Sequence, residues 1–415
     1  MMTPLYAAYK KVPLVLQIVI GLVIGTLLAL FCPEQTSFIK GFGDLFVKAL
    51  KSVAPLLVLV LVTSAIAAHQ KEGSSQLWKL MIIYFVSTFL AAVTAVGASF
   101  LFPVSVTLTG TAGEGAAVAG SISAVLYNIV INAVDNPVNA LINANYISIL
   151  VWAAALGYMF RNAKESTKAV LEDLASVVTA IVRIVIRLAP LGVMGLVYNS
   201  IVSQGGIDGL LGYASLIYVL VAVMAISALV INPAIVFIIT RKNPFPLVFK
   251  CLAESAYYAF FTRSSAANIP VNMALCDRMK VPRSMSSISI PLGATVNMAG
   301  AAITISVLTL SAVASLNGGV LNIDIWTAIL LCFMASLCAC GAGGIAGGSL
   351  MLIPLACSLF WIGNDVAMQM VAVGMIIGVI QDSCETALNS SSDALFTIAL
   401  SQKNLPPEGA GNAAS

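Results

Sequence analysis

The sequence predicts an all-α polytopic membrane protein, with eight transmembrane helices and two re-entrant helical hairpins arranged as inverted repeats. The first observation is composition: of 415 residues, 60% are hydrophobic and 9% are charged, whereas a soluble domain carries about 25% charged residues. The second is that the apolar runs have the length of bilayer spans and the period of helices. The third is that two long apolar segments are interrupted midway by small and polar residues, as in transporters built on inverted repeats.

The N-terminal part, residues 1–240, contains six apolar runs, and we expect each to form one span. The fourth run is expected to break at Asp135-Asn136-Pro137, because proline interrupts helical hydrogen bonding. Arg183 and Arg187 share one face of the fifth run, where snorkelling, pairing and substrate binding all stay open as roles. The six runs are residues 13–32, 44–68, 78–102, the interrupted pair 122–134 and 144–160, one long helix at 170–203, and 210–240.

The basic residues of the loops indicate the orientation. The loops near 33–43, 103–120, 204–209 and 314–325 contain only Lys40, whereas the alternate loops hold most of the lysines and arginines, at Lys10, Lys71, Arg161, Arg241, Arg278 and Lys403. Because cytoplasmic loops are enriched in these residues, both termini are expected to be cytoplasmic. This orientation requires an even number of crossings. Eight crossings satisfy it, with span seven at residues 286–310 and span eight at 367–400.

The C-terminal part, residues 241–403, contains two segments that the orientation does not allow to cross. Hairpin one, residues 245–276, lies between two basic loops, and hairpin two, residues 325–361, lies between two non-basic loops. Each breaks midway, at TRSSAAN (262–268) and at GAGGIAGGS (341–349). We therefore expect each to enter the membrane and return, one from either face, and the inverted repeat follows from this topology.

A stripe of polar residues marks the last helix as the centre of a binding site. Asp382, Thr386, Asn389 and Asp393 lie at offsets of four, seven and eleven residues, so at about 100° per residue they share one face, with Glu385 at its edge. Such a stripe is costly at membrane depth unless it faces protein or water. A helix end emerging into solvent is the alternative, but apolar runs flank the stripe on both sides.

The breaks supply the complementary chemistry. Half-helices that begin at a break present free N–H groups, which favour an anion, and Ser264 and Ser265 add hydroxyl donors. A third break is expected in PLGATVNMAG, residues 291–300, where Pro291 and Gly293 interrupt a helix and Asn297 offers an amide. Free carbonyl groups there, completed by Asp393, suit Na⁺. Helix kinks or close packing of small residues would explain any one break alone.

These groups together predict a site for an α-amino acid. The substrate carboxylate is expected to face Ser264, Ser265 and Asn389, and its ammonium group to face Asp382. Thr386 and Glu385 are then left for the side chain, and both can bond a hydroxyl group. A second carboxylate on the substrate would be repelled by Glu385.

Other classes of function have little support in the sequence. The single histidine, His69, argues against histidine catalysis and histidine metal sites, and a net charge of +3 spread along the loops argues against nucleic acid binding. An ion channel built on the same broken helices remains an alternative. An intramembrane hydrolase does not, because Asp382 and Asp393 are about 16 Å apart along one helix, too far for a catalytic dyad.

The order of the motifs resembles a known family. TRSSAANIP, PLGATVNMAG, the glycine-rich hairpin and D-x-x-x-T-x-x-N-x-x-x-D resemble the dicarboxylate/amino acid:cation symporters, the glutamate transporter family, and within it most nearly the bacterial sodium-coupled serine/threonine transporters. The resemblance implies a homotrimer in the bacterial inner membrane. It also implies an elevator fold, in which spans one, two, four and five form a scaffold. Spans three and six, both hairpins and the last two helices form the mobile transport domain.

The resemblance also implies a role for individual residues. Asp382 corresponds to the ligand of the substrate amino group, Thr386 to the hydroxyl contact and Asn389 to the amide that binds the carboxylate. Hairpin one contributes Ser265, with Arg263 before it, and hairpin two contributes Gly344. The implied sodium ligands are Gly293, Asn297, Asn389 and Asp393 at one site, and Thr295, Met298, Ala339, Cys340 and Ala342 at a second, mostly backbone site.

Two positions depart from the family pattern. Members with acidic substrates carry an arginine where this chain has Glu385, so the resemblance implies sodium-coupled uptake of L-serine and L-threonine. Many members carry an aspartate at the position of Ala299, so a third sodium site beside Tyr84, Ser87 and Thr88 is expected to be weak or absent. Two alternatives stay open: replacement of the missing arginine by Arg263, which would select acidic substrates, and coupling of transport to protons through the buried Glu385.

Overall fold

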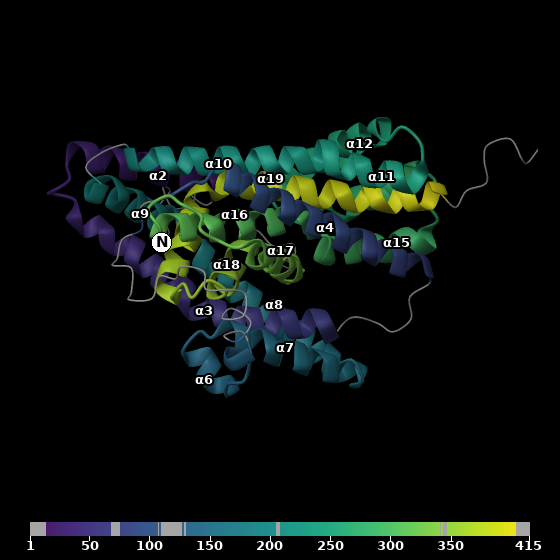
Figure 1. Ribbon diagram of the computed structural model, residues 1–415, viewed down its shortest axis with the longest axis horizontal. Helices are drawn as coiled ribbons and strands as arrows, with labels where there is room; N and C mark the ends of the chain where they lie inside the picture. The colour runs from purple at the N-terminus through teal and green to yellow at the C-terminus, as the bar shows by residue number, and fades with distance from the viewer. Residues whose placement is uncertain are drawn as a thin grey trace, which may run out of the picture.

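The computed structural model describes residues 14–67, 75–106, 108, 127, 130–204, 208–340, 342 and 347–403, and every regular element in these ranges is helical. Long helices run side by side along the long axis of the molecule (Figure 1). The N-terminal elements are α2 (Leu14–Phe31), η1 (Ser37–Ile39), α3 (Lys40–Ala67), α4 (Ser75–Leu101), α6 (Pro137–Ile142), α7 (Tyr146–Phe160), α8 (Glu165–Ile186), α9 (Ala189–Gln204), α10 (Asp208–Ile226), the π-helix η2 (Ser227–Ile231) and α11 (Asn232–Thr240).

The C-terminal elements surround one helix of 40 residues, α19. They are α12 (Phe245–Cys251), the π-helix η3 (Leu252–Ala256), α13 (Tyr257–Thr262), α14 (Ser265–Arg278), α15 (Arg283–Val296), α16 (Ala299–Leu316), α17 (Ile325–Ala339), the 3₁₀-helix η4 (Ser349–Leu352), α18 (Ile353–Ser358) and α19 (Asn364–Lys403). Helices α16 and α19 are buried along almost their whole length. The polar stripe on α19 therefore lies inside the protein, and the alternative of a helix end in solvent is wrong.

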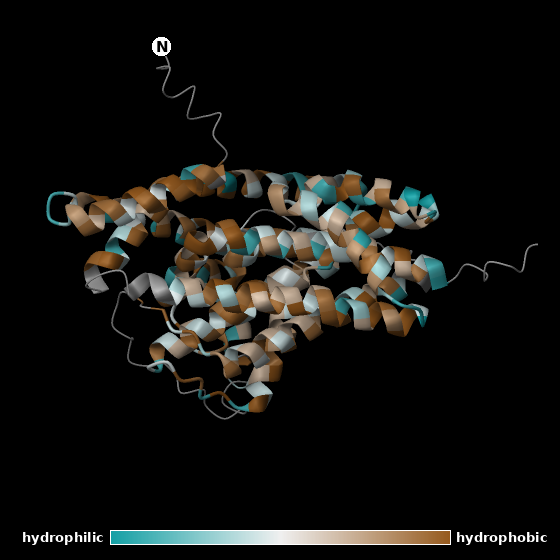
Figure 2. Cartoon of the chain, turned by 90° about the horizontal axis from the view of Figure 1, so that it is seen from above, coloured by the Kyte–Doolittle hydropathy of each residue, from teal (hydrophilic) through white to brown (hydrophobic). Residues whose placement is uncertain are grey.

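The spanning helices agree only in part with the predicted eight crossings. Within the described residues, five helices have the length and hydropathy of a span, and a bent pair of helices adds a sixth. The two shorter apolar helices Leu16–Phe31 and Tyr146–Phe160 would complete the eight. Brown ribbon, which marks hydrophobic residues, extends over most of the helices in Figure 2. The five long helices are Ser37–Ser64, Trp78–Leu101, Gly212–Thr240, Arg283–Leu316 and Asn364–Lys403.

The prediction of one continuous helix at residues 170–203 is wrong. The structure has two helices there, α8 and α9, bent by 50° at the junction. Pro190 is the second residue of α9 and has no N–H group, and its ring would collide with the carbonyl group of Ile186 in a continuous helix. The proline therefore explains the bend. Hydropathy alone does not indicate the bend, because the segment is apolar on both sides of it.

Close helix packing holds α2 against α9. A Cβ atom at Gly21 would lie 2.2 Å from the carbonyl oxygen of Pro190, and one at Gly25 would lie 2.4 Å from that of Met194. Two glycines four residues apart thus let the backbones approach, as small residues do between membrane helices. This contact packs the first predicted span, α2, against α9.

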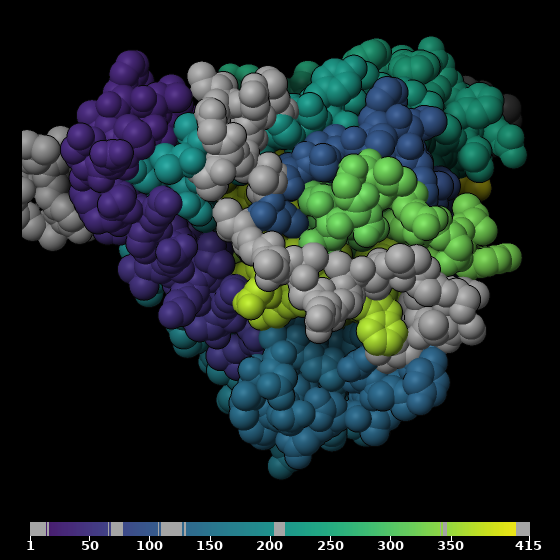
Figure 3. All heavy atoms as spheres, turned by 60° about the vertical axis from the view of Figure 1, so that its left-hand side comes forward, coloured from purple at the N-terminus to yellow at the C-terminus, as the bar shows by residue number. Residues whose placement is uncertain are grey.

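The predicted break in the fourth run lies where α6 begins. The side chain of Asn136 accepts hydrogen bonds from the N–H groups of Val138 and Asn139, so it caps the helix that starts at Pro137. Ala144, with φ of 52°, ends this short helix before α7. In the space-filling view, α6 and α7 form a blue lobe at one side of the molecule (Figure 3). Residues 122–126 of the predicted fourth run lie outside the described ranges.

Residues 245–278 form two arms that meet at a break. The first arm is α12, η3 and α13, and the second is α14; Arg263, with φ of 52°, and Ser264 lie between them. The amide of Asn268 on the second arm donates to the carbonyl and hydroxyl oxygens of Ser255 on the first arm, at 3.3 and 3.0 Å. The arms are therefore packed against each other, as the sequence predicts for hairpin one.

The predicted interruption at Pro291 and Gly293 is wrong in detail. Helix α15 continues through both residues to Val296, and the break is at Asn297 and Met298, before α16 begins. The missing N–H group of Pro291 costs the helix one hydrogen bond without ending it. Gly293 is required for close contact, because a Cβ atom there would lie 2.7 Å from Oδ1 of Asp393. The break still falls inside residues 291–300.

Candidate functional site

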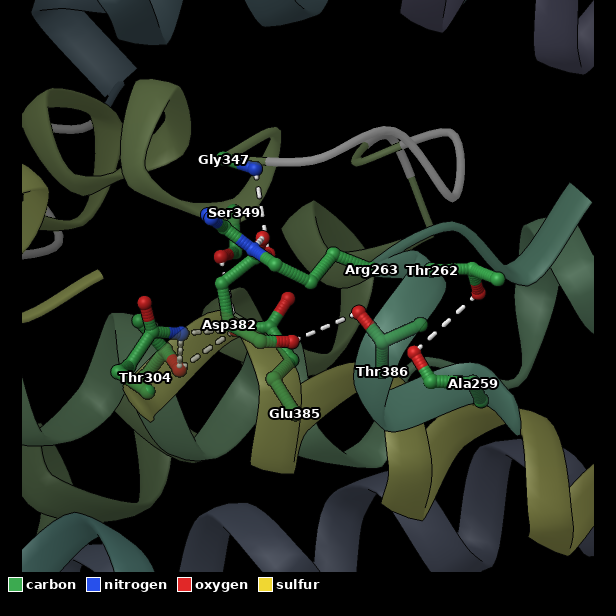
Figure 4. A network of polar contacts seen from close by, with 10 residues as sticks. Ala259, Thr262, Arg263, Thr304, Gly347, Ser349, Asp382, Glu385 and Thr386 are labelled. Carbon is green, nitrogen blue, oxygen red and sulfur yellow. Dashed lines mark hydrogen bonds and ion pairs between the residues drawn. The ribbon is translucent and has the colours of Figure 1, made fainter. Parts of the chain in front are cut away.

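Asp382 joins the two hairpins, because each of its carboxylate oxygens accepts a hydrogen bond from a different one. Nε of Arg263 in hairpin one donates to Oδ2 at 2.7 Å, and the backbone N–H of Gly347 in hairpin two donates to Oδ1 at 3.2 Å. Figure 4 shows the arginine side chain extending from the break of hairpin one toward this carboxylate. The left-handed conformation of Arg263 reverses the chain direction and brings its side chain over α19. The predicted ligand of an ammonium group is therefore paired with a guanidinium group.

Glu385 is held by three donors that all reach the same oxygen, Oε2. They are the hydroxyl of Thr304 at 2.7 Å, the hydroxyl of Ser349 at 2.8 Å and Nε2 of Gln381 at 2.5 Å. All four side chains are buried. An ionised carboxylate is an acceptor only, and three donors suit it. The sequence interpretation missed Thr304, Ser349 and Gln381; only the position of Gln381, one helical turn before Glu385, signalled such a contact.

Other predicted substrate ligands are engaged within the protein. The hydroxyl of Thr386 donates to the carbonyl oxygen of Asp382 at 2.7 Å. The amide oxygen of Asn389 accepts from the N–H of Gly300 at 2.7 Å, and its Nδ2 donates to Sδ of Met298 at 3.4 Å. Asn389 thereby contacts Met298 and Gly300 at the start of α16. It is a predicted ligand of both the substrate site and the first sodium site.

The two serines at the break of hairpin one have different surroundings. The side chain of Ser264 caps α14 by accepting from the N–H of Ala267 at 3.3 Å. Ser265 is the first residue of α14 and is buried. The N-terminus of α14 begins two residues after Arg263 and favours an anion.

The first predicted sodium site contains acceptors without donors. Nδ2 of Asn297 donates to Oγ of Ser392 at 2.7 Å and to Oδ1 of Asp393 at 2.8 Å. The other oxygens of this pair, Oδ1 of Asn297 and Oδ2 of Asp393, are buried and accept no hydrogen bond from the described residues. Burying a carboxylate oxygen without a partner is costly. A hard cation at these oxygens would remove that cost, and both ligand types suit Na⁺.

The second predicted sodium site lies where hairpin two approaches the break before α16. Sγ of Cys340 is 3.5 Å from the carbonyl oxygen of Val296, and the N–H of Ala342 donates to the carbonyl oxygen of Ala339 at 3.0 Å. Thr295 lies beside Val296, and its hydroxyl donates to the carbonyl oxygen of Leu292 at 2.9 Å. Hairpin two thus contacts the segment before the break through Cys340 and Val296. Gly344 and His69 lie outside the described residues.

The hydroxyl groups expected beside Ala299 bond to neutral partners. Oγ of Ser87 donates to Oδ1 of Asn232 at 3.2 Å, and the hydroxyl of Thr88 donates to the carbonyl oxygen of Tyr84 at 2.8 Å. The hydroxyl of Tyr84 donates to the carbonyl oxygen of Ser289 at 3.3 Å. No cluster of three or more His, Cys, Asp or Glu side chains exists in the described ranges.

A comparison with known families agrees with this geometry. The model of the sodium:dicarboxylate symporter family matches residues 14–403, which is nearly the whole chain. Together with the apolar helices, the match identifies a multi-pass membrane protein that carries out secondary active symport and is not an enzyme. The match does not distinguish acidic from neutral substrates for this chain, so that choice depends on the side chains of this site.

Proposed function

The chain belongs to the sodium:dicarboxylate symporter family, and we propose that it takes up L-serine and L-threonine together with sodium by an elevator mechanism. The observation that carries the choice of substrate is Glu385. It places a second carboxylate one helical turn from Asp382, and the guanidinium group of Arg263, which pairs with Asp382, is the basic group that the described structure shows at these acids. A site with two carboxylates and one guanidinium group favours a ligand with an ammonium group and disfavours an acidic side chain.

An exchange of ion pairs explains how a neutral amino acid would bind. Its ammonium group takes the place of Arg263 at Asp382. The carboxylate then pairs with the ammonium group in place of the guanidinium group. The released guanidinium group lies beside the N-terminus of α14, where Ser264 and Ser265 are located, and can bind the substrate carboxylate. The substrate hydroxyl is then within the part of the site that Thr386 and Glu385 form. Serine and threonine use every one of these contacts.

Sodium coupling is supported by the unpaired acceptors at Asn297 and Asp393. We assign one Na⁺ to these residues with Gly293 and Asn389, and a second to Thr295, Met298 and the tip of hairpin two at Ala339, Cys340 and Ala342. Ala299 brings no charge to a third site, so we expect two Na⁺ per amino acid. Flux ratios in proteoliposomes measure this number directly, and a ratio of three Na⁺ per serine would contradict it.

Helix α8 supports the homotrimer that the resemblance implies. Its exposed apolar residues are spaced alternately four and three apart, which is the seam pattern of helices that pack on a partner. Arg183, on the same helix, is exposed as well, and an arginine facing lipid is costly. We therefore propose that a second copy of the chain covers this face. The seam consists of Val170, Leu174, Val177, Ile181 and Ile184.

One end of the molecule supports the proposed orientation in a bacterial inner membrane. Figure 1 shows the end of α11, the start of α15 and the end of α19 together at its right-hand side. Arg241, Arg283 and Lys403 are located at these helix ends. A basic end of this kind is expected on the cytoplasmic face, which agrees with cytoplasmic termini.

Uptake of radiolabelled L-serine into proteoliposomes tests the function. We expect saturable uptake that requires an inward sodium gradient and is inhibited by unlabelled L-threonine but not by L-glutamate. Replacing sodium with choline at constant pH separates sodium coupling from proton coupling, because uptake that persists in choline would contradict our mechanism. Glutamate competing as well as serine would instead support the acidic alternative, and conduction without saturable uptake would support a channel.

A further inference from the structure

Glu385 connects hairpin two with the interior of the protein. The three donors to its Oε2 come from three different elements: Thr304 from α16, Ser349 from η4 in the second arm of hairpin two, and Gln381 from α19 itself. Thr304 and Gln381 are fully buried and Ser349 is 1% exposed. One carboxylate oxygen therefore ties a hairpin to two helices of the core.

The orientation of this carboxylate is set by Thr304 and Gln381. Nε2 of Gln381 donates to Oγ1 of Thr304 at 2.8 Å as well as to Glu385, and a hydroxyl group that accepts there directs its own hydrogen toward the carboxylate. Behind Glu385, a Cβ atom at Gly300 would lie 3.0 Å from its Cγ. The side chain is thus confined by α16 and held by charge-assisted hydrogen bonds, which are strong in a buried site.

The two hairpins are attached to α19 in different ways. Hairpin one is attached by the ion pair of Arg263 with Asp382 and also by neutral amides, since Nδ2 of Asn268 donates to Oγ of Ser390 at 2.7 Å and Nδ2 of Asn272 to its carbonyl oxygen at 2.9 Å. Hairpin two is attached through Gly347 to Asp382 and through Ser349 to Glu385. The contacts of hairpin two are therefore made with the same two carboxylates that we assign to the substrate.

We propose that the hydrogen bond from Ser349 to Glu385 is the latch that holds hairpin two closed, and that Thr304 and Gln381 are positioning residues that aim the carboxylate at it. The proposal rests on the proposed function, in which hairpin two is the gate and Glu385 faces the substrate hydroxyl. Oε1 of Glu385 takes no hydrogen bond from the described residues, so it is left for that hydroxyl. One carboxylate then recognises the substrate with one oxygen and fastens the gate with the other.

Hydrogen–deuterium exchange of hairpin two in the full-length protein tests the latch without reference to any substrate. In sodium without amino acid, we expect Ser349→Ala and Thr304→Val each to speed amide exchange at residues 347–358 by about tenfold, because each loses one hydrogen bond to a charged group. Ser306→Ala is the matched control, since Ser306 is a fully buried serine on α16 whose hydroxyl has no partner among the described residues. Thr304→Ser keeps the hydroxyl and should exchange like the wild type.

Transport kinetics provide the second readout. We expect Thr304→Val to lower the ratio of kcat/KM for L-serine to that for L-alanine by about tenfold, the value of one hydrogen bond to a charged group, and Thr304→Ser to restore it. Unchanged exchange in both Ser349→Ala and Thr304→Val would overturn the latch, even if the wild type transports serine. Faster exchange in these variants of a protein that does not take up serine would support the latch and contradict the proposed function.

Discussion

The two ends of the polar stripe on α19 differ in how their carboxylates are satisfied. Asp382 accepts from Arg263 and Gly347, one donor to each oxygen. Asp393 accepts from Asn297 on Oδ1, while its Oδ2 is buried without a donor among the described residues. A ligand at Asp382 must therefore displace a protein group, whereas a cation at Asp393 adds a missing partner. Under the proposed function, an amino acid is exchanged for a protein group at Asp382, whereas an ion completes the surroundings of Asp393.

The largest effect is expected from removing the charge at the sodium end. Asp393→Asn should reduce sodium-driven serine uptake by more than about 100-fold, because losing one member of a buried charge pair costs about 3–5 kcal/mol. Proteoliposome uptake measures the loss. Ser391→Ala on the same helix, whose hydroxyl bonds only to its own helix turn among the described residues, is the control and should transport normally. Normal uptake by Asp393→Asn would remove Asp393 from the sodium site.

Removing the charge at the substrate end should reduce uptake about as severely but leave sodium binding in place. Asp382→Asn loses the partner for the substrate ammonium group, and we expect a decrease of about 100-fold in uptake. The distinction between the ends is measured as the rise of Tm in sodium, which should persist in Asp382→Asn and be lost in Asp393→Asn. Loss of the sodium-induced rise in both variants would show that the two ends form one site.

A smaller change at the sodium end tests its geometry rather than its charge. The added methyl group of Gly293→Ala would meet Oδ1 of Asp393 at 2.7 Å and the hydroxyl of Tyr84 at 2.9 Å. We expect the sodium concentration for half-maximal uptake to rise about tenfold, as for overpacking that costs about 1–3 kcal/mol. Gly378→Ala is the control, since a Cβ atom at this position of α19 meets nothing within 4 Å. Equal effects of both substitutions would contradict a specific site.

The smallest effect is expected at Arg263. Arg263→Lys retains the charge but loses the donor geometry that reaches Oδ2 of Asp382, because a lysine presents a point charge on a flexible chain. Without substrate, the pairing of Asp382 is then weaker. Net uptake should therefore fall by about threefold more than serine–serine exchange, in which Asp382 always carries substrate. A parallel decrease of net uptake and exchange would contradict the displacement of Arg263 by the ammonium group.

Local sequence patterns predicted most of the elements near the site. Glycine, proline and serine clusters located the breaks around residues 263 and 297, because these residues disturb helical hydrogen bonding wherever they occur. The same rule failed at Pro291 and Gly293, which lie inside α15. It was not applied to Pro190, where the chain bends by 50°. A proline marks a lost hydrogen bond, but packing decides whether the helix ends, bends or continues.

The sequence by itself determined that α19 carries four polar groups on one face of a buried helix, because the helical period places them there and lipid forbids their exposure. Only the tertiary structure decided their partners. The contacts of Asp382 with Arg263, and of Glu385 with Thr304 and Ser349, join residues that are 119, 81 and 36 positions apart. Periodicity acts within one element, whereas hydrogen bonds between elements depend on how helices and hairpins pack, and this packing joined Glu385 to Ser349 of hairpin two.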